Sequence, residues 1–298
     1  MPKRFVISMH CNKLKENIKI YISHHEPIDE LDLPFVEMIS TNVDDGINIA
    51  DKEEYCELRT QYYVWKNYIH EYVGFFQFRR YLDISREVCD VNANKKSRPY
   101  IIKKSPNVKG MSLDIILNLK EKYDVIAPIP EYIGISVYER YSFSNGHRIE
   151  DLDRVVDILL SKYPYFRKAV EIYLSGSNEY YGNMFFMKKD IYEDYCSWLF
   201  YILFTFDEQS VDVLPKTNGY LGERLFGIYF TYLKLQNELS LGELPRVHFY
   251  CYDDTNHNLR GKKIINSLLP PGSKSKTMLR KVLYLWKRKC KKKIIKKN

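Results

Sequence analysis

The chain has 298 residues, of which 45% are hydrophobic and 15% aromatic, a composition that excludes a disordered protein and can bury a sizeable core. No run approaches the roughly 20 apolar residues of a membrane-spanning helix, and the apolar stretch near the N-terminus is too short for a signal peptide. The six cysteines are scattered without CxxC spacing, which indicates neither a zinc site nor a disulfide framework and predicts a reducing, cytosolic environment.

The net charge of +8 is unevenly distributed along the chain. Residues 273–298 contain twelve Lys and Arg and no acidic residue, so the remaining residues have a net charge of −4. A mildly acidic body followed by a strongly basic tail predicts a dedicated attachment segment. We therefore expect one folded domain over residues 1–265, followed by a linker and basic tail over residues 266–298.

Apolar runs bounded by turn residues predict a series of strands. The first run, IKIYIS, is rich in isoleucine, and an Asp-Gly pair marks a turn in the loop after the second. The expected strands span residues 18–23, 35–40, 72–78, 123–128, 183–187 and 246–252.

Apolar residues recur at helical spacing between these strands. One such stripe, which includes Tyr62 and Trp65, predicts an amphipathic helix over residues 54–69. Asp151 is the expected N-cap of a later helix, and residues 220–235 form another. Strands that alternate with helices predict an α/β fold with a mostly parallel central sheet.

Polar residues follow directly on the apolar strand predicted over residues 72–78. They are Gln77, Arg79 and Arg80, with Asp83 close behind. Ligands of α/β sheets bind at the carboxyl ends of strands, and guanidinium groups match the oxygens of phosphate groups. The motif therefore predicts a diphosphate site that also stabilises the charge of a leaving diphosphate. The alternative is that one arginine pairs with an internal carboxylate while the other is solvated.

The segment DDGINIADKEEYCELRTQYYVWKNYIHEYVGFFQFRRYLDI closely resembles the signature of a bacterial capsular and exopolysaccharide glycosyltransferase family. This family, formerly a domain of unknown function, includes galactofuranosyltransferases. The later segments YPYFRKAV, NMFFMKKDIYEDYCSWLFYIL and GYLGERL are also similar, so the resemblance covers roughly residues 18–250. Gln77 departs from the histidine that is usual in the family, and Gly222 from the usual serine.

The resemblance implies a GT-A-like fold, in which a Rossmann-type nucleotide-binding half is fused to an acceptor half. It implies transfer of a sugar, with galactofuranose expected, from a UDP-sugar donor to a saccharide acceptor. An inverting transferase needs a carboxylate that takes the proton of the acceptor hydroxyl. Glu223 fits that role because it opens an expected helix, whose N-terminus keeps a carboxylate ionised. The alternative is a capping or surface glutamate paired with Arg224.

The same resemblance suggests roles for the remaining polar residues. Gln77, Arg79 and Arg80 are expected to hold the donor diphosphate. His147, Asn183 and Arg224 are expected to contact the acceptor or the transferred sugar. For several residues of the expected nucleotide pocket the alternative is a structural role. Tyr62, for example, belongs to an apolar stripe. The expected nucleotide-pocket residues are His24, Asn48, Glu57, Tyr62, Lys66 and Asp83.

Many GT-A enzymes hold a divalent metal through an Asp-x-Asp motif, whereas this chain has QFRRYLD in the corresponding place. The two arginines are expected to supply the positive charge instead, so no metal cofactor is assigned with certainty. Asp83 is the candidate ligand, through water, should Mn²⁺ or Mg²⁺ bind. A metal site at His24 and His25, or at Asp253, Asp254 and His257, is a further alternative.

The basic tail has apolar residues at helical spacing, including Leu279, Val282, Leu283 and Trp286. This pattern predicts an amphipathic helix that binds an anionic membrane surface through residues 278–297. The alternatives are a solubilising tail and a nucleic-acid contact. No binding motif in the body supports the latter, so no nucleic-acid partner is expected.

These features together predict a cytoplasmic enzyme, peripheral on the inner face of the cell membrane. Its expected acceptor is a lipid-linked oligosaccharide of capsule, exopolysaccharide or lipopolysaccharide O-antigen synthesis. A hydrolase or phosphotransferase lacks support because the chain has no P-loop and no metal cluster of useful spacing. A non-catalytic nucleotide- or carbohydrate-binding module is the other alternative.

Overall fold

The computed structural model describes residues 17–26, 31–91, 99–103 and 111–249 of the chain. It also describes residues 267–269, 273, 275–276, 278–279 and 282–283 of the linker and tail. Within these residues, no helix is long and apolar enough to cross a membrane.

Three parallel strands begin the fold, and all three lie where the sequence predicts strands. They are β1 (Ile18–His24), β2 (Val36–Ser40) and β3 (Tyr72–Gln77), and β1 pairs with both of the others. β1 and β3 are apolar on both faces because the sheet is covered on both sides.

Further strands extend this group into a ten-stranded sheet, whose main path runs β5-β11-β7-β10-β3-β4-β12-β6. β10 lies antiparallel to both β3 and β7, and β4 is antiparallel to β3 because a two-residue connection cannot join parallel strands. The α/β class holds, but the sheet is mixed rather than mostly parallel. The remaining strands are β4 (Arg80–Leu82), β5 (Cys89–Asp90), β6 (Tyr100–Lys103), β7 (Val125–Pro128), β10 (Phe185–Lys188), β11 (Leu241–Leu244) and β12 (Arg246–Phe249), with β8 (Glu131–Tyr132) and β9 (Asn178–Glu179) in a separate pair.

The predicted helices are present with adjusted boundaries. The helix expected over residues 54–69 is a short 3₁₀ turn, Glu53–Tyr55, followed by α2 (Leu58–Asn67). Asp151 does not cap α5, because that helix begins at Ile149 and places Asp151 in its first turn, bonded to Arg148. The other helices are α3 (Leu113–Lys122), α4 (Val137–Phe143), α5 (Ile149–Lys162), α6 (Arg167–Ser175), α7 (Lys189–Glu208) and α8 (Thr217–Gln236), with a 3₁₀ turn at Pro164–Phe166.

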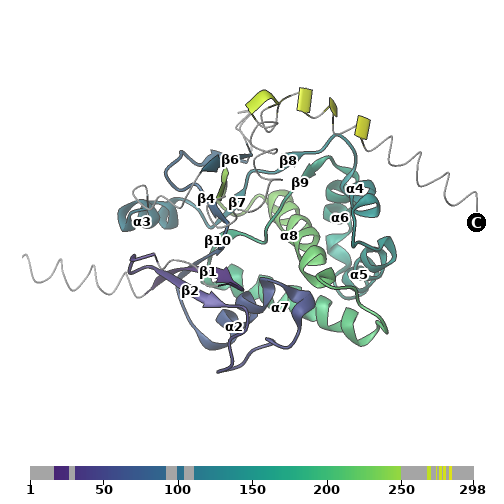
Figure 1. The fold of residues 1–298 in the computed structure, drawn as a ribbon, viewed down its shortest axis with the longest axis horizontal. Coiled ribbons are helices and arrows are strands. Elements are labelled where there is room, and N and C mark those ends of the chain that lie inside the picture. Colours follow the sequence, from purple (N-terminus) through teal and green to yellow (C-terminus); the bar gives the residue numbers. More distant parts are fainter. Residues whose placement is uncertain are drawn as a thin grey trace, which may run out of the picture.

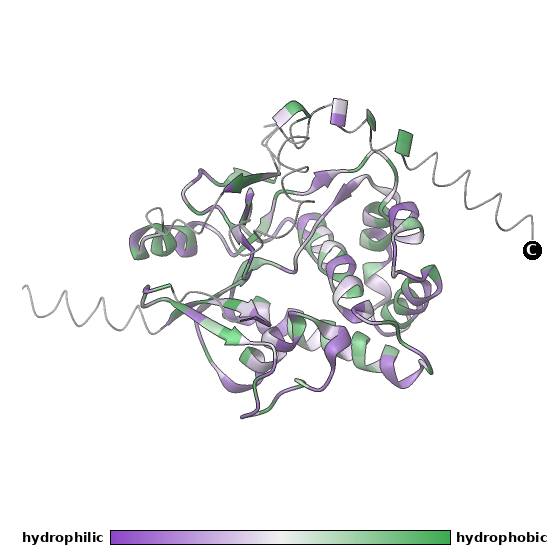
Figure 2. Ribbon diagram, in the orientation of Figure 1, coloured by the Kyte–Doolittle hydropathy of each residue, from purple (hydrophilic) through white to green (hydrophobic). Residues whose placement is uncertain are grey.

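Helices cover both faces of the sheet, as Figure 1 shows. Alternate residues of β3 separate the two cores, since Val73 and Phe75 face the large core whereas Tyr72 and Phe76 face the small one. The large core contains α2 and α4 to α8, and the small core contains α3. α3 shows both hydrophobic and hydrophilic residues in Figure 2, in keeping with a helix that buries one face.

Candidate active site

A cavity of about 470 Å³ opens at the carboxyl ends of β1, β2 and β3. β1 and β3 contribute Ser23 and Gln77 to its lining, Arg80 is the first residue of β4, and Thr41 follows β2 directly. Ligands of α/β sheets bind at this edge, so the position agrees with the site expected from the sequence. We call it the sheet-end cavity.

Two carboxylates, Glu57 and Glu223, line the sheet-end cavity. Glu57 Oε1 accepts hydrogen bonds from Gln77 Nε2 at 2.8 Å and from Asn183 Nδ2 at 2.9 Å. Burial, and then the charge of Glu223, raise the pKa of Glu57 to about 7. Glu57 can therefore exchange a proton near neutral pH.

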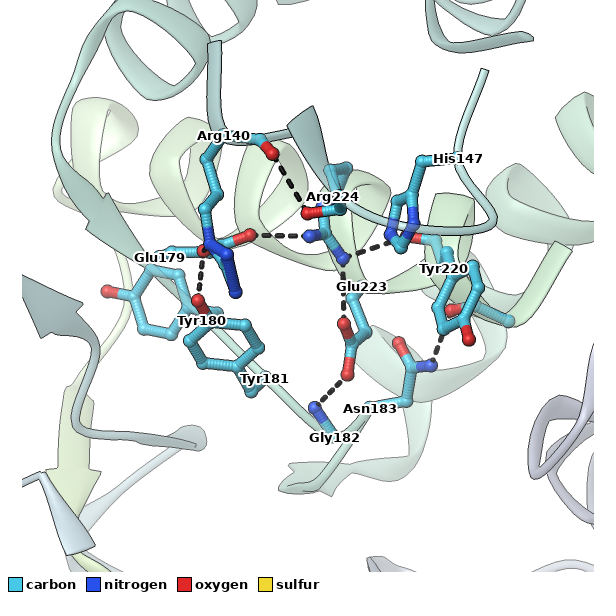
Figure 3. Close-up of polar contacts among 12 residues, drawn as sticks. Arg140, His147, Glu179, Tyr180, Tyr181, Gly182, Asn183, Tyr220, Glu223 and Arg224 are labelled. Carbon is cyan, nitrogen blue, oxygen red and sulfur yellow. Dashed lines mark hydrogen bonds and ion pairs between the residues drawn. The ribbon is translucent and has the colours of Figure 1, made fainter. Parts of the chain in front are cut away.

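Glu223 is held at both carboxylate oxygens, as Figure 3 shows. The backbone N–H of Gly182 donates to Oε1 at 2.6 Å, and Arg224 Nη1 donates to Oε2 at 2.7 Å. Contrary to the sequence-based expectation, Glu223 does not open its helix, because α8 begins at Thr217. The carboxylate is therefore stabilised by Arg224 and the Gly182 N–H, and not by the N-terminus of the helix.

Three cationic side chains surround the same cavity: Arg59, Arg80 and Lys216. Arg80 Nη1 donates to Gln77 Oε1 at 3.3 Å, and Arg59 is 8% exposed and donates to Ala50 O at 2.8 Å. Burial, and secondarily Arg246, lower the pKa of Arg80 from its ordinary value. The cavity thus combines cations suited to phosphate with carboxylates suited to proton transfer.

Backbone strain is concentrated around this cavity. Among the described non-glycine residues, four have positive φ, and Cys56, Asn183 and Lys216 are three of them, with φ of 51°, 48° and 68°. Cys56 and Lys216 line the cavity, and Asn183 bonds to Glu57. Such conformations cost about 1–3 kcal/mol each and cluster at functional sites, which supports a functional role for the cavity.

The two adjacent arginines of the sequence motif are placed differently. Arg80 lines the cavity, whereas Arg79 is not among the lining residues. Arg79 forms an ion pair with Glu26 at 3.4 Å, and its guanidinium lies 4.5 Å from the ring centroid of Phe78. Arg79 lies in the two-residue turn between β3 and β4, whereas Arg80 is the first residue of β4, so the two side chains have different surroundings.

Of the six residues expected in the nucleotide pocket, five lie outside the cavity lining and only Glu57 is part of it. His24 Nδ1 is 3.1 Å from Glu26 O, although the neighbouring His25 does line the cavity. Asn48 closes its own loop through a bond of 2.8 Å to Asp45 O. Tyr62 packs edge-on against Phe200 with centroids 4.9 Å apart, and Lys66 Nζ lies 3.4 Å from the Trp65 ring centroid.

Asp83 directly follows β4, is buried, and lines a different cavity from the sheet-end cavity. Its carboxylate accepts from Ser85 Oγ at 2.5 Å and pairs with Arg86 at 3.7 Å. In the described part of the chain, no three His, Cys, Asp or Glu side chains are grouped so that they could hold a metal ion. Asp253, Asp254 and His257 lie outside the described residues.

The residues expected at the acceptor or sugar cluster around α8. His147 stacks on Tyr220 with ring centroids 4.1 Å apart, and Tyr220 lines the cavity. Burial lowers the pKa of His147 to about 4, so the ring is neutral near pH 7. Asn183 and Arg224 reach the cavity through Glu57 and Glu223 respectively.

Sequence reasoning did not identify Arg59, Lys216, Thr41 or Ser23 as site residues. Arg59 directly follows Leu58, which belongs to an apolar helical stripe. Lys216 directly precedes α8, and the sequence predicted that this helix would begin only at residue 220. The one sequence signal that could have indicated Thr41 is its position directly after a predicted strand.

A second cavity of about 460 Å³ lies near the start of β7, with Lys122, Tyr123 and Asn237 in its lining. Lys234 also lines it and donates to Tyr180 Oη at 2.6 Å. Among the described residues no carboxylate lines this cavity, so their side chains do not provide the paired acid and base groups of the sheet-end cavity.

A family model described as a domain of unknown function, DUF4422, matches residues 19–235. The chain belongs to this family. The DUF4422 chain is also similar to a solved structure described as the apo form of WbbM, a bifunctional glycosyltransferase. The two share 28% sequence identity with a TM-score of 0.70, over 78% of this chain and 45% of WbbM. No curated protein matches the chain.

These similarities agree with the geometry of the DUF4422 chain. The α/β fold is GT-A-like, as expected from the sequence, and the family is related to glycosyltransferases. The chain spans less than half of the length of WbbM, a protein described as bifunctional.

Proposed function

We propose that the DUF4422 chain is an inverting glycosyltransferase that uses a nucleoside diphosphate sugar. The observation that carries this proposal is the sheet-end cavity, where Arg80 and the carboxylates of Glu57 and Glu223 meet. The structural similarity to a bifunctional glycosyltransferase supports the same reaction class. The expected donor is UDP-galactofuranose, which rests on the sequence resemblance described above.

In this proposal the nucleoside lies at the ends of β1 and β2. Thr41 is 4% exposed and lines the cavity, yet its hydroxyl has no hydrogen-bond partner among the described residues. An unpaired buried hydroxyl is costly, and a bound base or ribose would satisfy it. Arg59 lies beside this position, and Arg80 and Lys216 are available to the diphosphate.

The reaction is a single displacement. The oxygen of an acceptor hydroxyl bonds to the anomeric carbon of the donor while the bond from that carbon to the diphosphate breaks. Glu223 takes the hydroxyl proton, and the nucleoside diphosphate departs with its new negative charge next to Arg80 and Lys216. The acceptor sugar packs on Tyr220, whose ring is supported from behind by His147.

The acceptor proposed from the sequence is a lipid-linked saccharide at the cytoplasmic face of the membrane. The described tail residues Met278, Leu279, Val282 and Leu283 are between 43% and 71% exposed, which leaves apolar side chains available to a lipid surface. Lys276 is 8% exposed and donates to Tyr100 Oη at 3.2 Å, so the start of the tail contacts β6.

The test is a panel of nucleotide sugars incubated with the protein and a lipid-linked acceptor extract, with products detected by mass. We expect one donor, UDP-galactofuranose, to give a product heavier by one hexose, together with free UDP. A chelator arm shows whether Mn²⁺ or Mg²⁺ is needed. Thermal stabilisation by UDP without transfer or donor hydrolysis would instead indicate a non-catalytic binding module.

A further inference from the structure

A buried carboxylate, Glu179, lies behind the sheet-end cavity and does not line it. It belongs to β9 and is fully buried, with a relative exposure of 0%. Arg224, which is 2% exposed, lies between Glu179 and Glu223, as Figure 3 shows. Its Nη2 donates to Glu179 Oε1 at 2.5 Å, while its Nη1 donates to Glu223 Oε2 at 2.7 Å.

Glu179 is itself held in place by two further groups. The hydroxyl of Tyr181 donates to its carboxylate, and Arg140 Nε lies 3.6 Å from it. Taking such charges out of water is costly, and apolar residues of similar volume often give equal or greater stability. Stability alone therefore does not account for a buried ion pair at this position.

We infer that Glu179 is a positioning residue. Its negative charge balances the positive charge of Arg224, so that Arg224 can orient Glu223 without greatly weakening it as a base. This inference rests on the proposed function, because it assumes that Glu223 is the general base. A lone guanidinium against Glu223 would hold the carboxylate in its ionised form too strongly for it to accept a proton well. Sharing Arg224 with a second carboxylate weakens that effect and keeps the geometry.

Other titratable groups also face Glu223, and apart from Arg224 they are unchanged in the variants proposed below. Arg224 and Tyr220 lie on its own helix, and the remaining groups come from the elements packed against it. These are Cys56 and Glu57 before α2, Arg80 on β4, and Tyr173 on α6.

The test compares the pH dependence of kcat/KM for Glu179→Gln, Arg224→Gln and the double variant. In Glu179→Gln, Arg224 acts on Glu223 alone, so we expect the low-pH limb of the profile to move to lower pH. The plateau kcat should fall on the order of tenfold, with the KM for the donor unchanged. In Arg224→Gln, Glu223 faces Glu179 without a cation between them, so the limb should move to higher pH.

The double variant removes both charges and should return the limb close to its wild-type position. It also serves if a single variant does not fold, because it removes the buried charges of Glu179 and Arg224 together. Equal losses of kcat in both single variants without opposite movements of the limb would overturn the inference and indicate a structural role. Glu223→Gln separates the two hypotheses. If it retains transfer, the proposed function fails. If it abolishes transfer while Glu179→Gln behaves as wild type, only the inference fails.

Discussion

Gln77 Nε2 donates a hydrogen bond of 2.8 Å to Glu57 Oε1 and thereby joins the end of β3 to the residue that precedes α2. The same nitrogen donates to Gly182 O at 2.9 Å, and Gln77 Oε1 accepts from Arg80. One amide thus connects a carboxylate, a backbone carbonyl and a cation at the base of the cavity.

Replacing Gln77 should disturb all three partners at once. In Gln77→Leu, which has a similar volume, each partner loses a hydrogen bond worth about 1 kcal/mol or more. We expect transfer to fall at least tenfold and UDP to bind more weakly, measured by initial rates and calorimetry. Tyr62→Phe is the control, since Tyr62 packs on Phe200 outside the cavity lining. Similar effects in both variants would contradict the assignment of the site.

Arg79 and Arg80 offer a matched pair of neighbours with different surroundings. A hydrogen bond to a charged group contributes about 1.5–3 kcal/mol, so Arg80→Ala should weaken UDP binding about 10- to 100-fold. Arg79→Ala should change it less than about threefold, because its guanidinium pairs with Glu26 and Arg79 is not among the lining residues. Titration calorimetry measures both. A larger loss in Arg79→Ala would show that the diphosphate contacts the other arginine.

Glu57 should make stability depend on pH. Its pKa is raised from 4.5 to about 7 in the fold, so the folded state favours the protonated form. The stabilisation is fully present below about pH 4.5 and is lost as pH rises through 7. At pH 8, Glu57→Gln should therefore be more stable than the wild type, by up to about 3 kcal/mol.

Urea denaturation at pH 5 and pH 8 measures this difference. The gain in Glu57→Gln should be small at pH 5 and large at pH 8. The exposed Glu53 also lines the cavity, and Glu53→Gln is the control that should show no such trend. A constant difference between Glu57→Gln and the wild type at both pH values would contradict the account.

The basic tail gives a prediction about membrane binding. Each basic residue near an anionic leaflet contributes about 1 kcal/mol, so replacing Lys291, Lys292 and Lys293 by Gln should weaken binding on the order of 100-fold. Sedimentation with phosphatidylserine vesicles measures this, and zwitterionic vesicles should bind neither protein. Unchanged binding to the anionic vesicles would argue against membrane attachment through the tail.

The sequence was sufficient for the parts of the fold with strong periodicity. Apolar runs correctly placed β1, β2 and β3, and the arginine motif led to the sheet edge where the cavity lies. The short strands β8 and β9 have only two residues each and leave no recognisable pattern in the sequence. The antiparallel position of β10 depends on tertiary packing, which local periodicity does not report.

The site was predictable only in part, for a similar reason. Glu57, Gln77, Arg80 and Glu223 are brought together from segments far apart in the chain. Spacing cannot distinguish Arg79 from Arg80, because the direction of each side chain is fixed only when β4 folds back on β3. Nothing in the sequence indicates Glu179, because its proposed role depends on a contact with Arg224, which is 45 residues away.

The most direct test of the central claim is the comparison of sugar transfer and UDP binding in Glu223→Gln. The variant keeps the size of the side chain but cannot take a proton from the acceptor. We predict that UDP affinity stays within about threefold of wild type while the transfer rate falls by about 10²–10⁴-fold. Transfer at close to the wild-type rate would contradict the claim that this carboxylate is the general base of the sheet-end cavity.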